Sequence, residues 1–148
     1  MIRENNGLWI TGFAKPIAAF SSLAAKLFAL RERLAFCVEL QAQAVEVELD
    51  ASVAISLISC NITSNGDLSV LIDDCKEFPL QLPQARMTHC YREANCCVNA
   101  LAKLGANISS VCNRFNSPPP VVIPFLLADS LGTARTRMVA FGSYNSTS

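Results

Sequence analysis

The sequence has no excess of charge of either sign: 12 basic and 12 acidic side chains balance among its 148 residues. Nucleic-acid-binding proteins usually carry a basic stripe, because contacts with phosphate supply most of their affinity. Overall charge therefore gives no support for nucleic-acid binding and leaves only a local basic patch open.

Long apolar runs are also missing, since no stretch reaches the roughly 18 apolar residues that a membrane-spanning helix needs. The N-terminal stretch MIRENNGLWITGF has acidic and polar residues where a signal peptide would have its apolar segment. We therefore expect an intracellular protein, nuclear or cytoplasmic, that is neither secreted nor inserted in a membrane.

Metal-binding patterns of the zinc type are absent. His89 is the one histidine, and the seven cysteines are scattered without a C-x-x-C pair. Structural zinc sites combine such pairs with histidines or further cysteines, so we expect none. The odd number of cysteines favours reduced thiols that pack as small apolar side chains.

Apolar residues, by contrast, make up 51% of the chain, enough to build the core of one domain of this length. The pair Asn6-Gly7 between IRE and LWITGFA predicts a β-hairpin with a type I′ turn. Apolar spacing from Leu23 onward predicts a helix that Ser21-Ser22 can cap and that ends near Leu40.

Further alternation and helical spacing predict an α/β domain. The expected elements are a strand over 44–50, a short helix from Ser52, a helix from Asp67 to Phe78 before Pro79, a strand over 85–93, and a helix from Asn95 ended by Gly105. The run Pro118-Pro119-Pro120 then favours an extended backbone. We therefore expect a domain over residues 1–106 and an extended, proline-containing tail over 107–148.

Four blocks of sequence occur in a fixed order: IRENNGLWITGFAK, SSLAAKLFALRERL, VEVELDASVAISLI and HCYREANCCVNALAKLGA. Together they resemble the ribonuclease H-like domain of plant non-LTR retrotransposon reverse transcriptases, in the ribonuclease H type 1 superfamily. The resemblance implies a ribonuclease H-like mixed sheet flanked by helices. It also implies hydrolysis of the RNA strand of an RNA–DNA hybrid at two Mg²⁺ ions held by carboxylates.

The resemblance places acids in the first strand, the first helix, the end of the fourth strand and the last helix. The third is retained as Asp50, but Lys26 occupies the helix position in the motif A-A-E-L, and Asn99 occupies the position after R-E-x-N-x-x-A. The first acid is missing, because the sequence begins within what resembles the second strand. We expect a degenerate site with Asp50 as the one surviving metal ligand, no bound Mg²⁺ and no two-metal cleavage.

Each candidate also has a structural interpretation. Lys26 is either a solvated helical lysine or the partner of Asp50 in an ion pair, and Asp50 itself could cap the following helix. His89 is either the mobile catalytic histidine of such nucleases or, as we favour, a structural strand residue. The family suggests that Arg92 and Asn95 contact backbone phosphate or a minor-groove hydroxyl, although Asn95 is equally explained as a helix N-cap.

The family's strand order, 3-2-1-4-5, makes the missing first strand the central one. Three outcomes are open: the hairpin pairs with VEVEL, the tail segment VVIPFLL fills the gap, or the chain is marginally stable and associates. We expect the first arrangement in a compact structure, together with marginal stability.

Three functions remain open on the sequence. The first is a catalytically inactive ribonuclease H-type domain of retroelement origin, with residual binding to RNA–DNA hybrid or other nucleic acid. The second is a protein-interaction module or a gene fragment without a selected role. The third is an active hybrid ribonuclease, which the substituted acids disfavour.

Overall fold

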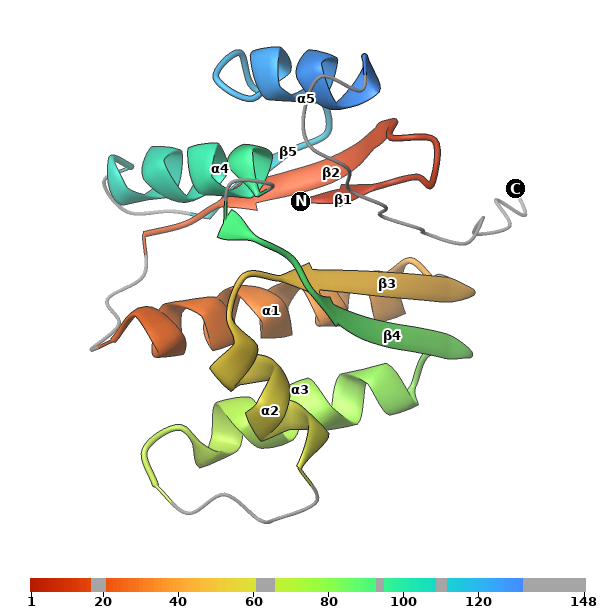
Figure 1. Ribbon diagram of the computed structural model, residues 1–148, viewed down its shortest axis with the longest axis vertical. Helices are drawn as coiled ribbons and strands as arrows, with labels where there is room; N and C mark the ends of the chain where they lie inside the picture. Colours follow the sequence, from red (N-terminus) through yellow and green to blue (C-terminus); the bar gives the residue numbers. More distant parts are fainter. Residues whose placement is uncertain (17–20, 61–65, 93–94, 109–111, 132–148) are drawn as a thin grey trace. The chain divides into compact units, whose positions relative to one another are not determined.

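A computed structural model describes residues 1–16, 21–60, 66–92, 95–108 and 112–131. These residues form two compact units. One comes from the described residues within Met1–Ala18 and Cys90–Ala140, and the other from those within Ala19–His89. Each unit has its own strands and helices (Figure 1). Within the described ranges, no helix combines the length and the apolar character that crossing a membrane requires.

The first unit is built on an antiparallel sheet with the strand order β1-β2-β5. Its strands are β1 (Ile2–Arg3), β2 (Trp9–Ala14) and β5 (Asn113–Phe115). Its helices are α4 (Cys96–Ala106) and α5 (Ile123–Ser130). Helix α4 packs against β2, and α5 contacts α4 (Figure 1).

The hairpin between β1 and β2 is confirmed, but its predicted turn type is wrong. The carbonyl of Glu4 accepts the N–H of Gly7 at 2.9 Å, and Gly7 has a φ of 86°. Among the described residues other than glycine, Gln41 alone has a positive φ, so Asn6 does not. A type I′ turn needs positive φ at both central residues, whereas a three-residue loop needs it only at the last. Gly7 fills that last position.

The core of the first unit gathers around Cys97, Ala100, Leu101 and Val122. Cys97 and Val122 are completely buried. The partly buried residues packed against this cluster are Met1, Trp9, Phe115 and Leu126. Three of these residues therefore lie beyond residue 107. The expectation of an extended backbone there is wrong for α5, which is a helix, whereas β5 is an extended strand that pairs with β2. Burial of their apolar side chains stabilises the folded unit relative to a chain that leaves them in water.

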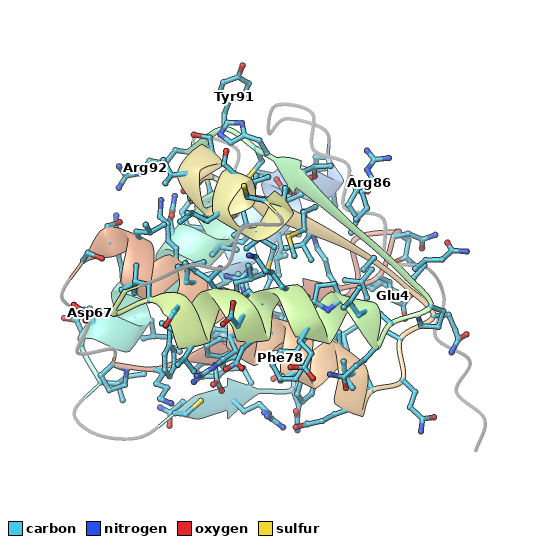
Figure 2. All side chains as sticks on the ribbon, turned by 90° about the horizontal axis from the view of Figure 1, so that it is seen from below. Glu4, Asp67, Phe78, Arg86, Tyr91 and Arg92 are labelled. Atoms are coloured by element: carbon cyan, nitrogen blue, oxygen red, sulfur yellow. The ribbon has the colours of Figure 1, made fainter. Side chains whose placement is uncertain are left out.

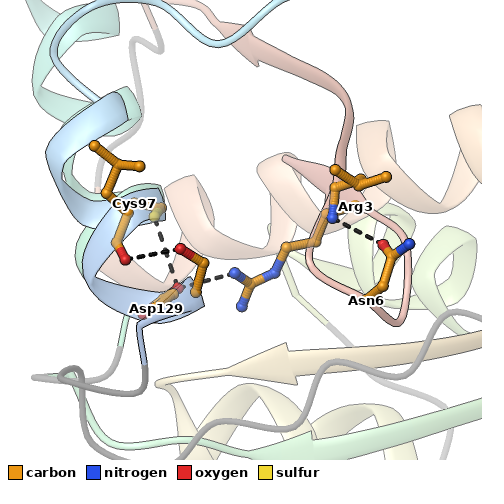
Figure 3. Close-up of polar contacts among 7 residues, drawn as sticks. Arg3, Asn6, Cys97 and Asp129 are labelled. Carbon is orange, nitrogen blue, oxygen red and sulfur yellow. Dashed lines mark hydrogen bonds and ion pairs between the residues drawn. The ribbon is translucent and has the colours of Figure 1, made fainter.

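An ion pair connects α5 with the hairpin of β1 and β2 (Figure 3). Arg3 Nη1 lies 2.8 Å from Asp129 Oδ2, and the two side chains are only 6% and 16% exposed. The thiol of Cys97 on α4 also donates to this oxygen, at 4.0 Å. Three segments that are distant in sequence thus meet at one carboxylate.

Gly105 does not end α4 by adopting a left-handed conformation, as the sequence suggested. The helix continues to Ala106, and its C-cap is Asn107. A Cβ atom at Gly105 would lie 2.9 Å from both the backbone N and the backbone O of Lys15. Glycine is needed here because the main chain at Lys15 passes directly against the helix.

The second unit contains a parallel pair of strands, β3 (Ala44–Leu49) and β4 (Gln84–His89). Its helices are α1 (Ser22–Glu39), α2 (Ser52–Ser59) and α3 (Ser69–Leu80). Helix α1 packs along α3, and α2 contacts both helices and both strands (Figure 1). Parallel and antiparallel strands with flanking helices confirm the predicted α/β class.

Helix α1 forms as its sequence predicts. The hydroxyl of Ser21 accepts the N–H of Ala24 at 3.0 Å, which satisfies one of the free donors at the helix start. One side of the helix places Leu27, Leu30 and Leu34 in the core, each at most 1% exposed. Burial of these leucines holds α1 in the second unit.

Two expectations for the strands and helices are wrong. Among the described residues β3, which contains VEVEL, pairs only with β4, so the hairpin does not pair with it. The tail segment VVIPFLL does not fill the gap as a strand either, because most of it forms α5. Instead, β5 supplies the second partner of β2. Helix α3 begins after Leu68 rather than Asp67. It also includes Pro79 in its last turn, where the missing N–H removes one helical hydrogen bond.

The buried thiols of the second unit make its stability sensitive to alkaline pH. Burial raises the pKa of Cys37 to about 11 and the pKa of Cys75 to about 12. The unfolded thiols ionise near their ordinary value of 9.0, so the folded state loses relative stability as pH rises from 9 through 11 to 12. We expect urea unfolding midpoints to fall over this range. A Cys75→Ala variant should show a shallower fall, and an unchanged pH profile would contradict the assignment.

Candidate functional site

The structure brings Lys26 and Asp50 together in the second unit. Asp50 directly follows β3, at the carboxyl end of the strand, and Lys26 lies on α1. Lys26 Nζ is 3.0 Å from Asp50 Oδ1. Of the two interpretations for Lys26, the ion pair is therefore the one that the structure contains. Asp50 is not the N-cap of α2, because that position belongs to Ala51.

This ion pair neutralises a carboxylate that has little access to water. The side chain of Asp50 is 8% exposed, whereas that of Lys26 is 36% exposed. A buried carboxylate without a counter-charge is costly, so the ammonium group substitutes for the charge that a cation would bring. A Mg²⁺ ion at Asp50 would compete with Lys26 for this carboxylate.

His89 lies at the same end of the parallel strand pair. It pairs in register with Leu49, the residue before Asp50, and it is exposed. The carboxyl ends of parallel strands lie at one edge of a sheet, which is where α/β folds usually build their sites. The position is compatible with either interpretation of His89.

The residues present do not fit a two-metal site. In the part of the chain that the structure describes, no three or more His, Cys, Asp or Glu side chains are grouped so that they could hold a metal ion. Mg²⁺ prefers several anionic oxygen ligands in octahedral geometry. Asp50, with Lys26 beside it, offers one carboxylate and one repelling charge.

Arg92, Asn95 and Asn99 come together in the first unit, at the start of α4. The carbonyl of Arg92 accepts the N–H of Asn95 at 3.0 Å and the side-chain amide Nδ2 of Asn99 at 3.4 Å. Asn95 occupies the N-cap position, as predicted, but its side chain makes no capping hydrogen bond. It is only 8% exposed, which leaves little of it available for direct contact with nucleic acid.

Asn99 has a role here that an acid could not fill. An amide nitrogen donates a hydrogen bond to the Arg92 carbonyl, whereas an ionised carboxylate has acceptors only and would repel that carbonyl. The residue at the fourth acid position therefore helps to fix the backbone before α4. Reasoning from the sequence treated Asn99 only as a weakened ligand and missed this function.

Tyr91 was also missed by the sequence reasoning. Its side chain is 76% exposed, next to the exposed Arg92, and Figure 2 shows both side chains pointing away from the ribbon. A large exposed aromatic residue beside an arginine is typical of nucleic-acid contact surfaces. The adjacent letters Y and R were the available signal.

A protein family and a plant protein are similar in sequence to this chain. The family described as reverse transcriptase-like matches residues 1–105. A protein of Arabidopsis thaliana, named as a candidate ribonuclease H protein, is 30% identical over 139 residues. The alignment covers 94% of this chain but only 22% of that protein, so the chain spans about a fifth of the relative's length. No solved structure matches the chain.

Proposed function

This chain belongs to the reverse transcriptase-like family and carries its ribonuclease H-like domain of the retroelement type, and we propose that it binds RNA–DNA hybrid without cleaving it. The family supports nucleic acid as the ligand. The residues at the acid positions support the absence of catalysis, because cleavage of this type depends on two metal ions held by a set of carboxylates.

The ion pair between Lys26 and Asp50 is the observation that carries the proposal. Opposite unit charges about 4 Å apart attract by about 4 kcal/mol at an effective dielectric near 20. The attraction is smaller at a partly exposed lysine, but a bound Mg²⁺ would still have to overcome it and the repulsion from the ammonium group. Asp50 thus has an ammonium group rather than a second carboxylate beside its Oδ1.

Hybrid binding would depend on a small positive surface rather than on overall charge. The net charge is zero, and the exposed Arg92 is the arginine of the R-E-x-N motif for which the resemblance suggests a phosphate contact. Few phosphate contacts predict weak binding with a shallow dependence on salt.

The direct test incubates the full chain with a labelled RNA–DNA hybrid in Mg²⁺ or Mn²⁺ and measures both cleavage and binding. We expect binding that weakens as salt rises, with cleavage no faster than in buffer. Arg92→Gln should weaken binding, because one phosphate contact is lost. Lys103→Gln removes the same charge from the far end of α4 and serves as the matched control.

Either half of the proposal can fail separately. Cleavage that disappears in Asp50→Asn would show an active nuclease with Asp50 as a ligand. An absence of salt-sensitive binding in every buffer would remove nucleic acid as the ligand and favour a protein-interaction role.

A further inference from the structure

We propose that Tyr91 is a stacking platform for an unpaired nucleotide, so that this domain prefers an RNA–DNA hybrid with a single-stranded end over a blunt hybrid. The inference rests on the proposed function, since it assigns a preferred form to the same ligand. It concerns Tyr91 and Arg92, which follow β4, together with Asn99, whose side-chain amide donates to the Arg92 carbonyl.

Exposure is the first observation behind this assignment. Tyr91 is 76% exposed, although burying an aromatic ring is favourable and the first unit has an apolar core available. Figure 2 shows the ring extending from the surface with Arg92 nearby on the same segment. Within the described residues, no carboxylate forms an ion pair with Arg92.

The hydrogen bonds to the Arg92 carbonyl are the second observation. The Arg92 carbonyl accepts hydrogen bonds from the Asn95 backbone at 3.0 Å and from Asn99 Nδ2 at 3.4 Å. Asn95 is itself buried, and α4 is anchored in the core through Cys97 and Leu101. Hydrogen bonds that restrain the backbone at Arg92 lower the entropy cost of presenting this residue and its neighbour to a ligand. Asn99 is thus a positioning residue for Tyr91 and Arg92.

The chemistry of this pair selects an unpaired nucleotide. An aromatic ring stacks on the face of a base, and the faces of paired bases inside a duplex are already covered by their neighbours. A base in a single-stranded end has a free face. A guanidinium group one residue away would then contact the adjoining phosphate. Every base has a stacking face, so the preference should tolerate any sequence in the single-stranded end.

The test compares two labelled hybrids of the same duplex length, one blunt and one with a short single-stranded end, by fluorescence anisotropy. We expect the full chain to bind the second more tightly by about five-fold or more, the range of a single base–aromatic stack. Tyr91→Ala should abolish the difference without weakening binding to the blunt hybrid, and Tyr91→Phe should preserve it.

Two further variants isolate the mechanism. Leu80→Ala truncates another exposed residue, 84% exposed on α3, and should leave both affinities unchanged. Asn99→Asp should reduce the preference by releasing the segment, although it leaves the ring of Tyr91 intact. Melting curves confirm that each variant is folded.

The outcomes separate this inference from the function it rests on. Equal affinity of the wild-type chain for both hybrids, or a preference that survives Tyr91→Ala, would overturn the stacking role while hybrid binding stands. An absence of binding to either hybrid would overturn both.

Discussion

A chain that ends at Ala106 is expected to lose the folded first unit. The removed residues include β5, whose three residues pair with β2, and α5. They also include the core members Phe115, Val122 and Leu126. The boundary after residue 106 is a prediction from the sequence, and this truncation tests it directly.

The expected loss is as large as the stability of an ordinary domain. Fully burying one large apolar side chain contributes about 1.5–3 kcal/mol. Val122 is completely buried, and Phe115 and Leu126, which are partly buried, contribute less each. Breaking a buried ion pair by removing one partner costs about 3–5 kcal/mol, and Arg3 loses Asp129. Small domains are stable by only about 5–15 kcal/mol in total. The truncated first unit should therefore be largely unfolded.

Trp9 reports this change without any label, because it is the one tryptophan of the chain. Its indole Nε1 donates to the carbonyl of Phe115 at 3.1 Å, so the truncation also removes a hydrogen-bond partner. We expect red-shifted fluorescence that no longer changes in urea. A chain ending at residue 131 is the control and should behave like the full chain. Native-like emission from the shorter chain would show that residues 1–106 fold alone.

The ion pair between Arg3 and Asp129 gives a point-mutation version of the same experiment. Arg3→Met leaves a carboxylate that is 16% exposed without its counter-charge, whereas Arg3→Met with Asp129→Leu replaces both charges by apolar groups. Such double replacements of buried pairs are often neutral or stabilising. Recovery of stability in the double variant would assign the loss to the unpaired charge rather than to packing.

Local patterns predicted most elements, because each depends on neighbours in sequence. The leucine spacing of α1 and its Ser21 cap are examples, and Asp50 was correctly placed at the end of β3. The ion pair between Lys26 and Asp50 was one of two interpretations that the sequence left open, and the structure contains it. The sequence shows the opposite charges at the two motif positions. It does not show how deeply they are buried, which decides whether they form an ion pair.

What the sequence could not predict depends on contacts between distant segments. Nothing local indicates that residues 113–115 would pair with β2, or that the apolar run after Val122 would form a helix rather than a strand, because short apolar runs suit both. Gly105 was taken for a helix end because glycine is common there. Its actual cause, the close passage of Lys15, involves a residue about 90 positions earlier.

Lys26→Glu is expected to produce the largest change at the candidate site. The substitution puts a negative charge on α1 in place of the ammonium group that pairs with Asp50. The side chain of Asp50 is only 8% exposed. Breaking a buried pair costs about 3–5 kcal/mol, but Lys26 is partly exposed and its replacement can turn toward water, so we expect a loss of about 2 kcal/mol. The measurement is urea unfolding of the variant and the wild-type chain in EDTA.

Divalent cations should then change the stability of Lys26→Glu but not that of the wild-type chain. Two carboxylates are a better Mg²⁺ or Mn²⁺ ligand set than a carboxylate beside an ammonium group, and a cation that binds only the folded state stabilises it. Millimolar Mn²⁺ should therefore restore part of the stability of Lys26→Glu and leave the wild-type chain unchanged. Lys26→Gln, which removes the positive charge without adding a carboxylate, should be destabilised but respond much less to the ion. Equal stabilisation of the wild-type chain by Mn²⁺ would mean that Lys26 yields its place to a cation, and the proposal of an inactive site would fail with it.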